Sequence, residues 1–132
     1  MNQPMNPFDE LGGEPAVRAL VERFYDAMDR TETKLARLHP GDEEGRVSRG
    51  SRDRFALFLI GWLGGPQDYV AEHGHPRLRW RHTRVPVDLA MRDAWMRCMC
   101  IAMDESGVKP ELRAYLEARF AEVATFLLNR PS

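Results

Sequence analysis

The sequence predicts an all-α domain, in which four principal helices are arranged as two packed pairs. Apolar residues recur at helical spacing in four segments of the 132-residue chain, and a period of two persists nowhere. Glycine and proline breaks separate these segments. Because one hydrophobic core serves a chain of this length, we expect a single domain over residues 1–132, with residues 1–7 as a flexible N-terminal extension.

The first helix is expected to begin at Glu14, directly after the Gly12-Gly13 break, where Pro15 suits the first turn. Residues 31–50 hold glycines and a proline among charged and hydroxyl side chains without a sustained period, so a loop with short helical turns is expected there. The apolar stripe of the first helix consists of Val17, Leu20, Val21, Phe24 and Met28.

The second helix is expected to start at Ser48 or Ser51, since either hydroxyl suits a helix cap. The Gly64-Gly65-Pro66 break ends it, and an irregular stretch runs on to about residue 76. The stripe of this helix consists of Phe55, Phe58, Leu59 and Trp62.

The third and fourth helices occupy the C-terminal part of the chain. Asp88 is expected to cap the third, which ends near Gly107, and Pro110 opens the fourth. Loops as long as those between the helices usually carry a function or hold a ligand in a compact domain. The two stripes consist of Met91, Trp95, Cys98 and Ala102, and of Leu112, Leu116, Phe120, Val123 and Leu127.

The composition excludes several classes of protein. Nineteen basic and twenty acidic residues give a formal charge of −1, so neither a nucleic acid nor an anionic membrane is expected as a partner. Cys98 and Cys100 lie two apart in a predicted helix, where side chains point about 200° apart and cannot form a disulfide. The chain has no apolar run near the roughly 20 residues of a spanning helix and no signal-peptide pattern, so the reducing cytoplasm is expected.

The segment HGHPRLRWRHTRVP, residues 73–86, contains three of the four histidines. His73 and His75, together with His39 or His82, could form an imidazole site for zinc or copper. Solvated loop imidazoles are the more ordinary interpretation, because the chain has neither a CxxC nor an HExxH pattern. The ring of His82 could instead point inward and act as a ligand.

The same segment contains a basic loop over residues 77–84. Guanidinium is a planar fork that matches phosphates, carboxylates and nucleic-acid backbones alike, and Trp80 would suit stacking on single-stranded bases. One basic loop on a nearly neutral protein is poor evidence for nucleic acid, whereas a cofactor that carries two carboxylates would be bound equally well. The arginines of the loop are Arg77, Arg79, Arg81 and Arg84.

Two aromatic residues combine helical core positions with polar donors. Tyr25 lies beside the stripe of the first helix, and Trp95 lies on the stripe of the third. Aromatic side chains at such positions usually belong to the core, but a buried hydroxyl or indole N–H needs a hydrogen-bond partner. That partner could be the backbone, a water molecule or a ligand.

Five motifs follow one another in the order FDELGG, RFYDAM, WLGGPQDY, HGHPRLRWRH and MRDAWMRCM. With this order and spacing the chain resembles a group II truncated haemoglobin over about residues 7–129. The most specific pieces are GGP-x-x-Y, GHPRLRxRH and RDAWxRCM. The resemblance implies the truncated-globin fold, a two-over-two helical sandwich, with haem b (iron protoporphyrin IX) as cofactor, and it implies that residues 64–74 form the loop that shapes the proximal side.

The resemblance also implies residue roles around the haem. His82 matches the proximal histidine, a neutral imidazole with one nitrogen on iron and the other in a hydrogen bond. Arg54 and Arg81 match positions that pair with the haem propionates. The implied cofactor-binding residues are Arg54, Phe55, Phe58, Arg81, His82 and Trp95.

On the distal side, Tyr25 and Trp95 match donors that face bound oxygen, whose outer atom carries partial negative charge. Ser51 takes the place of the distal histidine of ordinary globins. His39 departs from the tyrosine or phenylalanine of many members, and it could donate to the ligand, act through water or bind iron as a sixth ligand; we favour a hydrogen-bonding role. The implied distal ligand-binding residues are therefore Tyr25, His39, Ser51 and Trp95.

The function implied by the resemblance is reversible binding of dioxygen, and of other diatomic ligands such as CO and NO, at five-coordinate ferrous iron. Oxygen transport, NO-detoxifying dioxygenation, peroxidase activity and sensing stay open as roles, since one fold hosts several. Turnover would need a reductase, because no flavin or nicotinamide motif occurs in the chain. The alternative is a haem-free helical module that binds an anionic partner through loop 77–84. The oligomeric state, monomer or homodimer, stays open too.

Overall fold

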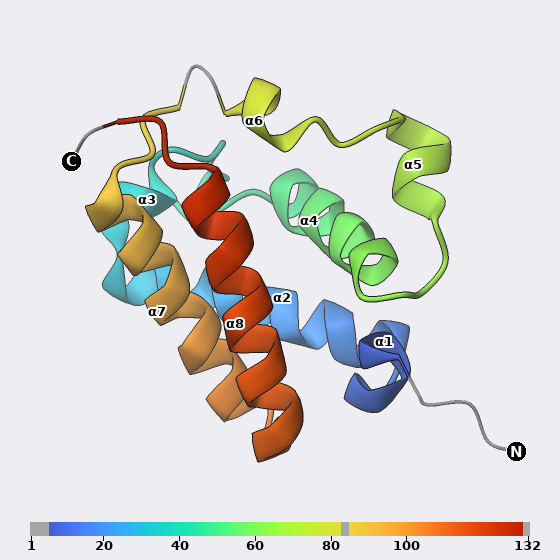
Figure 1. Ribbon diagram of the computed structural model, residues 1–132. Helices are drawn as coiled ribbons and strands as arrows, with labels where there is room; N and C mark the ends of the chain where they lie inside the picture. The colour runs from blue at the N-terminus through green and yellow to red at the C-terminus, as the bar shows by residue number, and fades with distance from the viewer. Residues whose placement is uncertain (1–5, 83–84, 131–132) are drawn as a thin grey trace, which may run out of the picture.

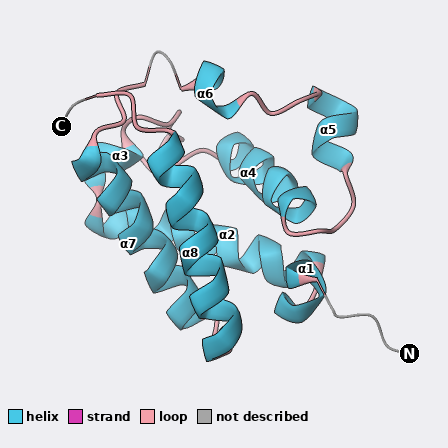
Figure 2. Ribbon diagram, viewed as in Figure 1, coloured by secondary structure: helices cyan, strands magenta, loops and turns pink. Residues whose placement is uncertain are grey.

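The computed structural model of the protein describes residues 6–82 and 85–130, apart from the side chains of Arg79 and Arg81. Within these ranges the chain forms helices joined by loops, and the β-structure is limited to one isolated bridge between Gly41 and Val47. Figure 2 shows this arrangement, which confirms the predicted all-α class. None of the helices in these ranges is long and apolar enough to cross a membrane.

The four predicted principal helices are α2 (Glu14–Thr31), α4 (Arg49–Trp62), α7 (Leu89–Glu105) and α8 (Pro110–Phe126). Helix α2 packs against both α4 and α7, and α7 packs against α8. In Figure 1, α7 and α8 run together across α2, and α4 lies beside them. The two pairs, α2 with α4 and α7 with α8, confirm the expected sandwich.

The helix starts follow the predicted capping chemistry. Ser48 rather than Ser51 caps α4, because the backbone N–H of Ser51 donates to the Ser48 hydroxyl. Asp88 caps α7 as expected, and its carboxylate accepts a hydrogen bond from the backbone N–H of Met91 at 2.8 Å. These caps fix where the two helices begin.

Four shorter helices complete the described fold: α1 (Pro7–Leu11), α3 (Thr33–Ala36), α5 (Asp68–His73) and α6 (Leu78–Arg81). Helix α3 lies in the loop where short helical turns were expected. The interpretation of residues 64–76 as irregular was wrong for α5, because six residues are too few to show a helical period. Helix α5 is held by Tyr69, whose ring packs on Phe58 at 5.6 Å between centroids.

The N-terminal extension expected over residues 1–7 falls mainly on residues 1–5, which lie outside the described ranges. Asn6 already caps α1, since its side-chain oxygen accepts from the backbone N–H of Asp9. The same side chain donates to the carbonyl of Gly64, so α1 docks on the turn after α4. Gly65 permits this contact, because a Cβ there would lie 2.7 Å from the ring of Phe8.

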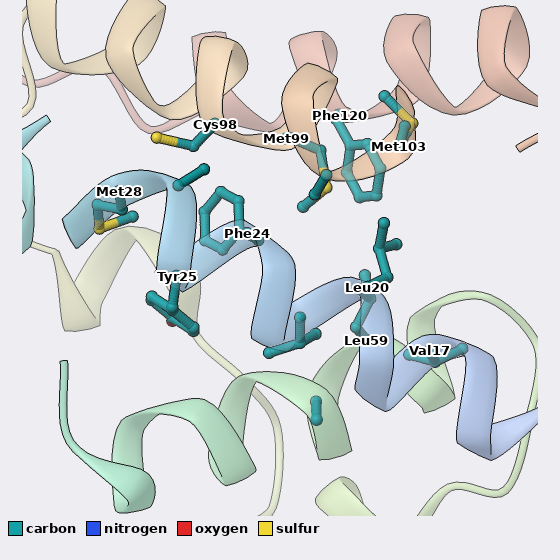
Figure 3. Packing of buried hydrophobic residues seen from close by; sticks show 14 of the residues in the cluster. Val17, Leu20, Phe24, Tyr25, Met28, Leu59, Cys98, Met99, Met103 and Phe120 are labelled. Carbon is teal, nitrogen blue, oxygen red and sulfur yellow. The ribbon is translucent and has the colours of Figure 1, made fainter. Parts of the chain in front are cut away.

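The core lies where α2, α4, α7 and α8 meet. Figure 3 shows Phe24 on the side of α2 that faces α7 and Tyr25 on the other side, toward α4. Adjacent residues of one helix therefore contribute to two different environments: Phe24 to the centre of the sandwich, and Tyr25 to a cavity beside it. The largest side chains that are fully buried include Leu20, Phe24, Met28, Leu59, Met99, Met103 and Leu116.

Candidate functional site

A cavity of about 380 Å³ lies between the helices of the sandwich and the segment that contains α6. This volume lies within the roughly 300–1,000 Å³ range of small-molecule and cofactor sites. Most of its wall is apolar or aromatic, as expected for a site that excludes water. The structure brings seven of the sequence-predicted site residues to this wall: Tyr25, His39, Arg54, Phe55, Phe58, His82 and Trp95.

His82 follows α6 directly and presents its ring to the cavity. Its Nδ1 lies 2.6 Å from the backbone carbonyl of Leu78. Because a carbonyl only accepts, Nδ1 carries the proton, and Nε2 of the neutral ring has a free lone pair. Such a ring is oriented and electronically prepared as a metal ligand.

The backbone around His82 is tied to the end of α8. The side-chain amide of Asn129 donates to the carbonyls of His82 and Val85, each at 2.9 Å. The carbonyl oxygen of Asn129 in turn accepts from the backbone N–H of Val87 at 2.8 Å. These hydrogen bonds hold His82 and residues 85–87 against the end of α8.

Four aromatic residues of the cavity wall carry a polar donor for which the described residues offer no hydrogen-bond partner: Tyr25, Trp62, Tyr69 and Trp95. The donors that the sequence predicts to face a ligand are those of Tyr25 and Trp95. Burial raises the pKa of the Tyr25 phenol, so the hydroxyl keeps its proton at neutral pH. Both rings contact Phe24 edge-on, at centroid distances of 4.9 Å and 5.1 Å. Phe24 thus packs against both rings, which belong to the wall of one cavity.

His39 lies at the same end of the cavity, with its ring edge-on to Tyr25 at 5.6 Å. Its Nδ1 lies 3.0 Å from the carbonyl of Leu35, so Nδ1 again carries the proton and Nε2 is an acceptor. Burial lowers the pKa of His39 below its ordinary value and favours this neutral form. As placed, a neutral His39 can accept a hydrogen bond in the cavity but has no second N–H to donate to a ligand.

Replacing His39 with glutamine is expected to flatten the pH dependence of stability on the acid side of pH 6.5. The unfolded chain binds a proton near the ordinary pKa of 6.5, while the folded chain resists protonation, so the free energy of unfolding falls as pH drops below 6.5. The contribution of neutral His39 to the free energy of unfolding is fully present above pH 6.5. Urea unfolding at pH values on both sides of 6.5 measures it.

The matched control for this prediction is His75→Gln, which changes an exposed histidine. It should leave the pH profile of the free energy of unfolding as it is in the parent. Parallel profiles for the parent and His39→Gln would contradict a buried neutral His39.

Of the two arginines predicted to bind the carboxylates of a cofactor, the structure describes the side chain of Arg54 but not that of Arg81. Arg54 is exposed at the rim of the cavity, and its guanidinium has no ion-pair partner among the described residues. It is available to a carboxylate of a bound molecule. Arg81 ends α6, but its side chain lies outside the described part of the structure, as do residues 83–84.

Ser51 does not reach the cavity wall. It lies buried in the first turn of α4, where its hydroxyl accepts from the Ser48 hydroxyl at 3.2 Å. Because Ser51 lies in the first turn of α4, its hydroxyl points toward Ser48, the residue that caps this helix. The expected distal role of Ser51 therefore has no geometric support, and Phe55, one turn later, lines the cavity instead.

The alternative of a multi-histidine metal site finds no support in the described residues. No group of three or more histidine, cysteine or acidic side chains is placed there to hold a metal ion. His73 packs on the ring of Tyr69 at 4.9 Å, and Nδ1 of His75 accepts from the backbone N–H of Arg77. Both histidines are exposed, in agreement with the solvated-imidazole interpretation.

The residue-by-residue interpretation of the sequence missed part of the cavity wall and one buried charge. Tyr69 closes the cavity beside Phe58, and a helix of six residues gave no period that could reveal it. Arg52 is 5% exposed and pairs with three carboxylates of α2. The acidic positions 22, 26 and 29 share one face of α2 at helical spacing, which is the signal that could have indicated a buried cation opposite them.

The chain is similar to known proteins over nearly its whole length. The family model of bacterial-like globins matches residues 6–129. The group 2 truncated haemoglobin YjbI of Bacillus subtilis (strain 168) is 35% identical over 130 residues, which cover 98% of this chain and 94% of that protein.

Solved structures agree with this similarity. The cold-adapted truncated haemoglobin of the Antarctic marine bacterium Pseudoalteromonas haloplanktis TAC125 has a TM-score of 0.87 and 39% identity, covering 96% of this chain and 99% of that one. The truncated oxygen-avid haemoglobin of Bacillus subtilis has a TM-score of 0.84 and 34% identity, covering 95% of this chain and all of that one (100%). The helical fold is thus shared with truncated haemoglobins.

Proposed function

Because the chain belongs to the bacterial-like globin family, as a group II truncated haemoglobin, we propose that it holds haem b through His82 and binds dioxygen reversibly. Membership of the family carries haem binding and an oxygen-related function. The relative from Bacillus subtilis that is described as oxygen-avid supports dioxygen as the ligand. We extend the proposal to CO and NO, since each is a diatomic molecule of similar size.

The residues present fit the cofactor. The observation that carries the proposal is the ring of His82, which faces an apolar cavity with Nδ1 bound to the Leu78 carbonyl and with Nε2 free. Tyr25 and Trp95 belong to the wall of the same cavity and have no hydrogen-bond partner for their donors among the described residues, and Arg54, which has no ion-pair partner there, stands at its rim. A large apolar ring system with a metal centre and peripheral carboxylates would satisfy each of these groups.

When bound, haem would supply a ferrous iron that can bind a diatomic gas. His82 holds the cofactor and keeps its ring orientation through Leu78. Phe55, Phe58 and Leu59 form the apolar wall that excludes water, which strengthens every hydrogen bond inside the cavity. The hydroxyl of Tyr25 donates a hydrogen bond to the gas molecule.

Trp95 contributes the second donor, from α7 rather than α2. Two donors on separate helices stabilise the partial negative charge of bound dioxygen better than one donor does, so we expect slow release of dioxygen. Arg54 receives a carboxylate of the cofactor, and the same role for Arg81 is proposed from the family resemblance alone. His39 can accept a hydrogen bond from a water molecule in the cavity, while its edge-on ring contact supports the ring of Tyr25.

The test is the absorption spectrum of the purified protein after expression with ample iron and porphyrin. We expect a strong Soret band and one haem per chain. A colourless protein that instead binds an anionic partner through loop 77–84 would overturn the proposal in favour of the haem-free module.

NO-detoxifying dioxygenation and peroxidase-type activity are further proposals for the same cavity. Either activity needs electrons from a separate reductase, since the sequence holds no flavin or nicotinamide motif. We place the protein in the cytoplasm, which suits the two free thiols of Cys98 and Cys100.

A further inference from the structure

The side chain of Arg52 is buried in α4, and hydrogen bonds fix all three of its nitrogens. Nε donates to the carbonyl of Val47 at 3.0 Å, and Nη2 donates to Asp29 at 2.8 Å. Nη1 donates to Glu22 at 3.0 Å and to Asp26 at 2.8 Å. Because guanidinium is planar and rigid, four such bonds leave its plane no freedom to rotate.

This guanidinium lies over the phenol ring of Tyr25, with Cζ 5.7 Å from the ring centroid. That distance is within the roughly 6 Å of an attractive cation–π contact. The acidic partners on α2 lie on both sides of Tyr25 in the sequence: Glu22 one turn before it, Asp26 next to it and Asp29 one turn after it. The three carboxylates and Arg52 form an ion cluster, and this ion cluster holds the guanidinium at the level of the Tyr25 ring.

The other neighbours of the Tyr25 ring are apolar or neutral. Phe24, His39 and Phe55 contact it edge-on, at centroid distances of 4.9, 5.6 and 5.8 Å. Arg52 is the cation that lies over the ring, and Arg54 also acts electrostatically on the phenol, with a smaller effect. A cation at this position opposes the effect of burial on the phenol pKa and makes the O–H a stronger donor.

We propose that Arg52 is a positioning residue for Tyr25: the fixed guanidinium lies over the phenol ring, keeps the hydroxyl aimed into the cavity and polarises its O–H bond. The inference rests on the proposed function, in which that hydroxyl donates to the bound gas. It assigns to the ion cluster a role in ligand retention, in addition to the joining of α2 and α4.

A purely structural role would make the same cluster a clamp between two helices, and the test must separate the two. Arg52→Gln removes the charge over the ring, while Arg52→Lys keeps a charge but loses the planar fork. Arg49→Gln is the matched control, because Arg49 also binds Glu22 but is exposed and makes no contact with the Tyr25 ring. Each variant is made in the parent and in a Tyr25→Phe background.

The first measurement is the dissociation rate constant of dioxygen from the haem-loaded protein. We expect Arg52→Gln to raise it by about three- to tenfold when Tyr25 is present, and by less than about twofold in the Tyr25→Phe background. Arg52→Lys should give a smaller increase, and Arg49→Gln no increase. The same factor for Arg52→Gln in both backgrounds would overturn the proposal.

The second measurement does not depend on ligand release. The chain has three tyrosines, so selective ¹³C labelling of their Cζ atoms gives three signals in the CO-bound protein, and Tyr25→Phe assigns one of them. This signal should shift in Arg52→Gln and in Arg52→Lys but not in Arg49→Gln. If Arg52→Gln fails to fold, Arg52→Lys carries both measurements.

An unshifted Tyr25 signal in the Arg52 variants would overturn the inference. A shifted signal, combined with a Tyr25→Phe variant that releases dioxygen at the parental rate, would support the contact between Arg52 and Tyr25 while refuting the donor role in the proposed function. The failure of the inference and the failure of the proposed function are therefore distinguishable.

Discussion

Replacing His82 with glycine is expected to weaken haem retention by more than about 100-fold, because the loss of a partner that merely orients a metal ligand already costs about 10–100-fold. The substitution removes the imidazole whose Nδ1 is fixed by Leu78 and whose Nε2 faces the cavity. The rate of haem transfer to an acceptor apoprotein measures retention. The absorption spectrum of the variant should change at the same time.

Added imidazole provides the sharper part of this experiment. The glycine variant leaves a space of the shape of the lost ring, so free imidazole should partly restore the parental spectrum. The matched control, His75→Gly, alters an exposed histidine of the same segment and should retain haem as the parent does. Parental haem retention and spectrum in His82→Gly would refute the assignment of His82 as the metal ligand.

Replacing Trp95 with phenylalanine is expected to speed dioxygen release by about one to two powers of ten, since a hydrogen bond to a charged group contributes about 1.5–3 kcal/mol. The ring contacts to Phe24 and Phe120, at 5.1 Å and 5.7 Å, show that an aromatic side chain is needed there for packing. Phenylalanine keeps most of that packing and removes the indole N–H. Stopped-flow displacement of dioxygen by CO measures the release rate.

Trp62→Phe is the matched control for this prediction. Trp62 also lines the cavity, but its ring is stacked on Phe120 at 5.2 Å and covered by the guanidinium of Arg119, away from the contacts of Tyr25. It should release dioxygen at nearly the parental rate. Release from Trp95→Phe at the parental rate would mean that the indole does not reach the ligand.

The double variant, with both Tyr25 and Trp95 replaced by phenylalanine, tests whether the two donors act together. Donors to the same molecule are coupled, so the combined effect should differ from the product of the two single effects. A strictly multiplicative result would indicate that only one of the donors contacts the ligand and that the other acts on the pocket indirectly.

The long helices could be predicted from the sequence because their signals are local. The stripe from Val17 to Met28 repeats over several turns of α2, and the break at Gly64-Gly65-Pro66 ends the signal of α4. Capping chemistry is similarly local, and Asp88 starts α7 as expected. Helix α5 is shorter than two helical turns, and its stability comes from the packing of Tyr69 against residues distant in the sequence.

The site could be predicted only in part. Spacing alone marked Tyr25 and Trp95 as aromatic donors on apolar stripes, and His82 as one histidine of a basic segment. Their joint role came from the resemblance of five motifs to one family, because residues on α2, on α7 and after α6 are far apart in the sequence. The structure brings these side chains to one cavity, which no local pattern encodes.

The sequence by itself determined the helical class, the four principal helices, their caps and breaks, and the family to which the motifs belong, because each of these depends on residues that are near one another or on a fixed order of motifs. Tertiary structure alone decided that Ser51 turns toward the helix cap, that His39 presents an acceptor to the cavity, and that Arg52 lies over the ring of Tyr25. The physical reason is that a hydrogen-bond partner, a buried charge and a cavity wall are relations between elements, and these exist only once the helices have packed.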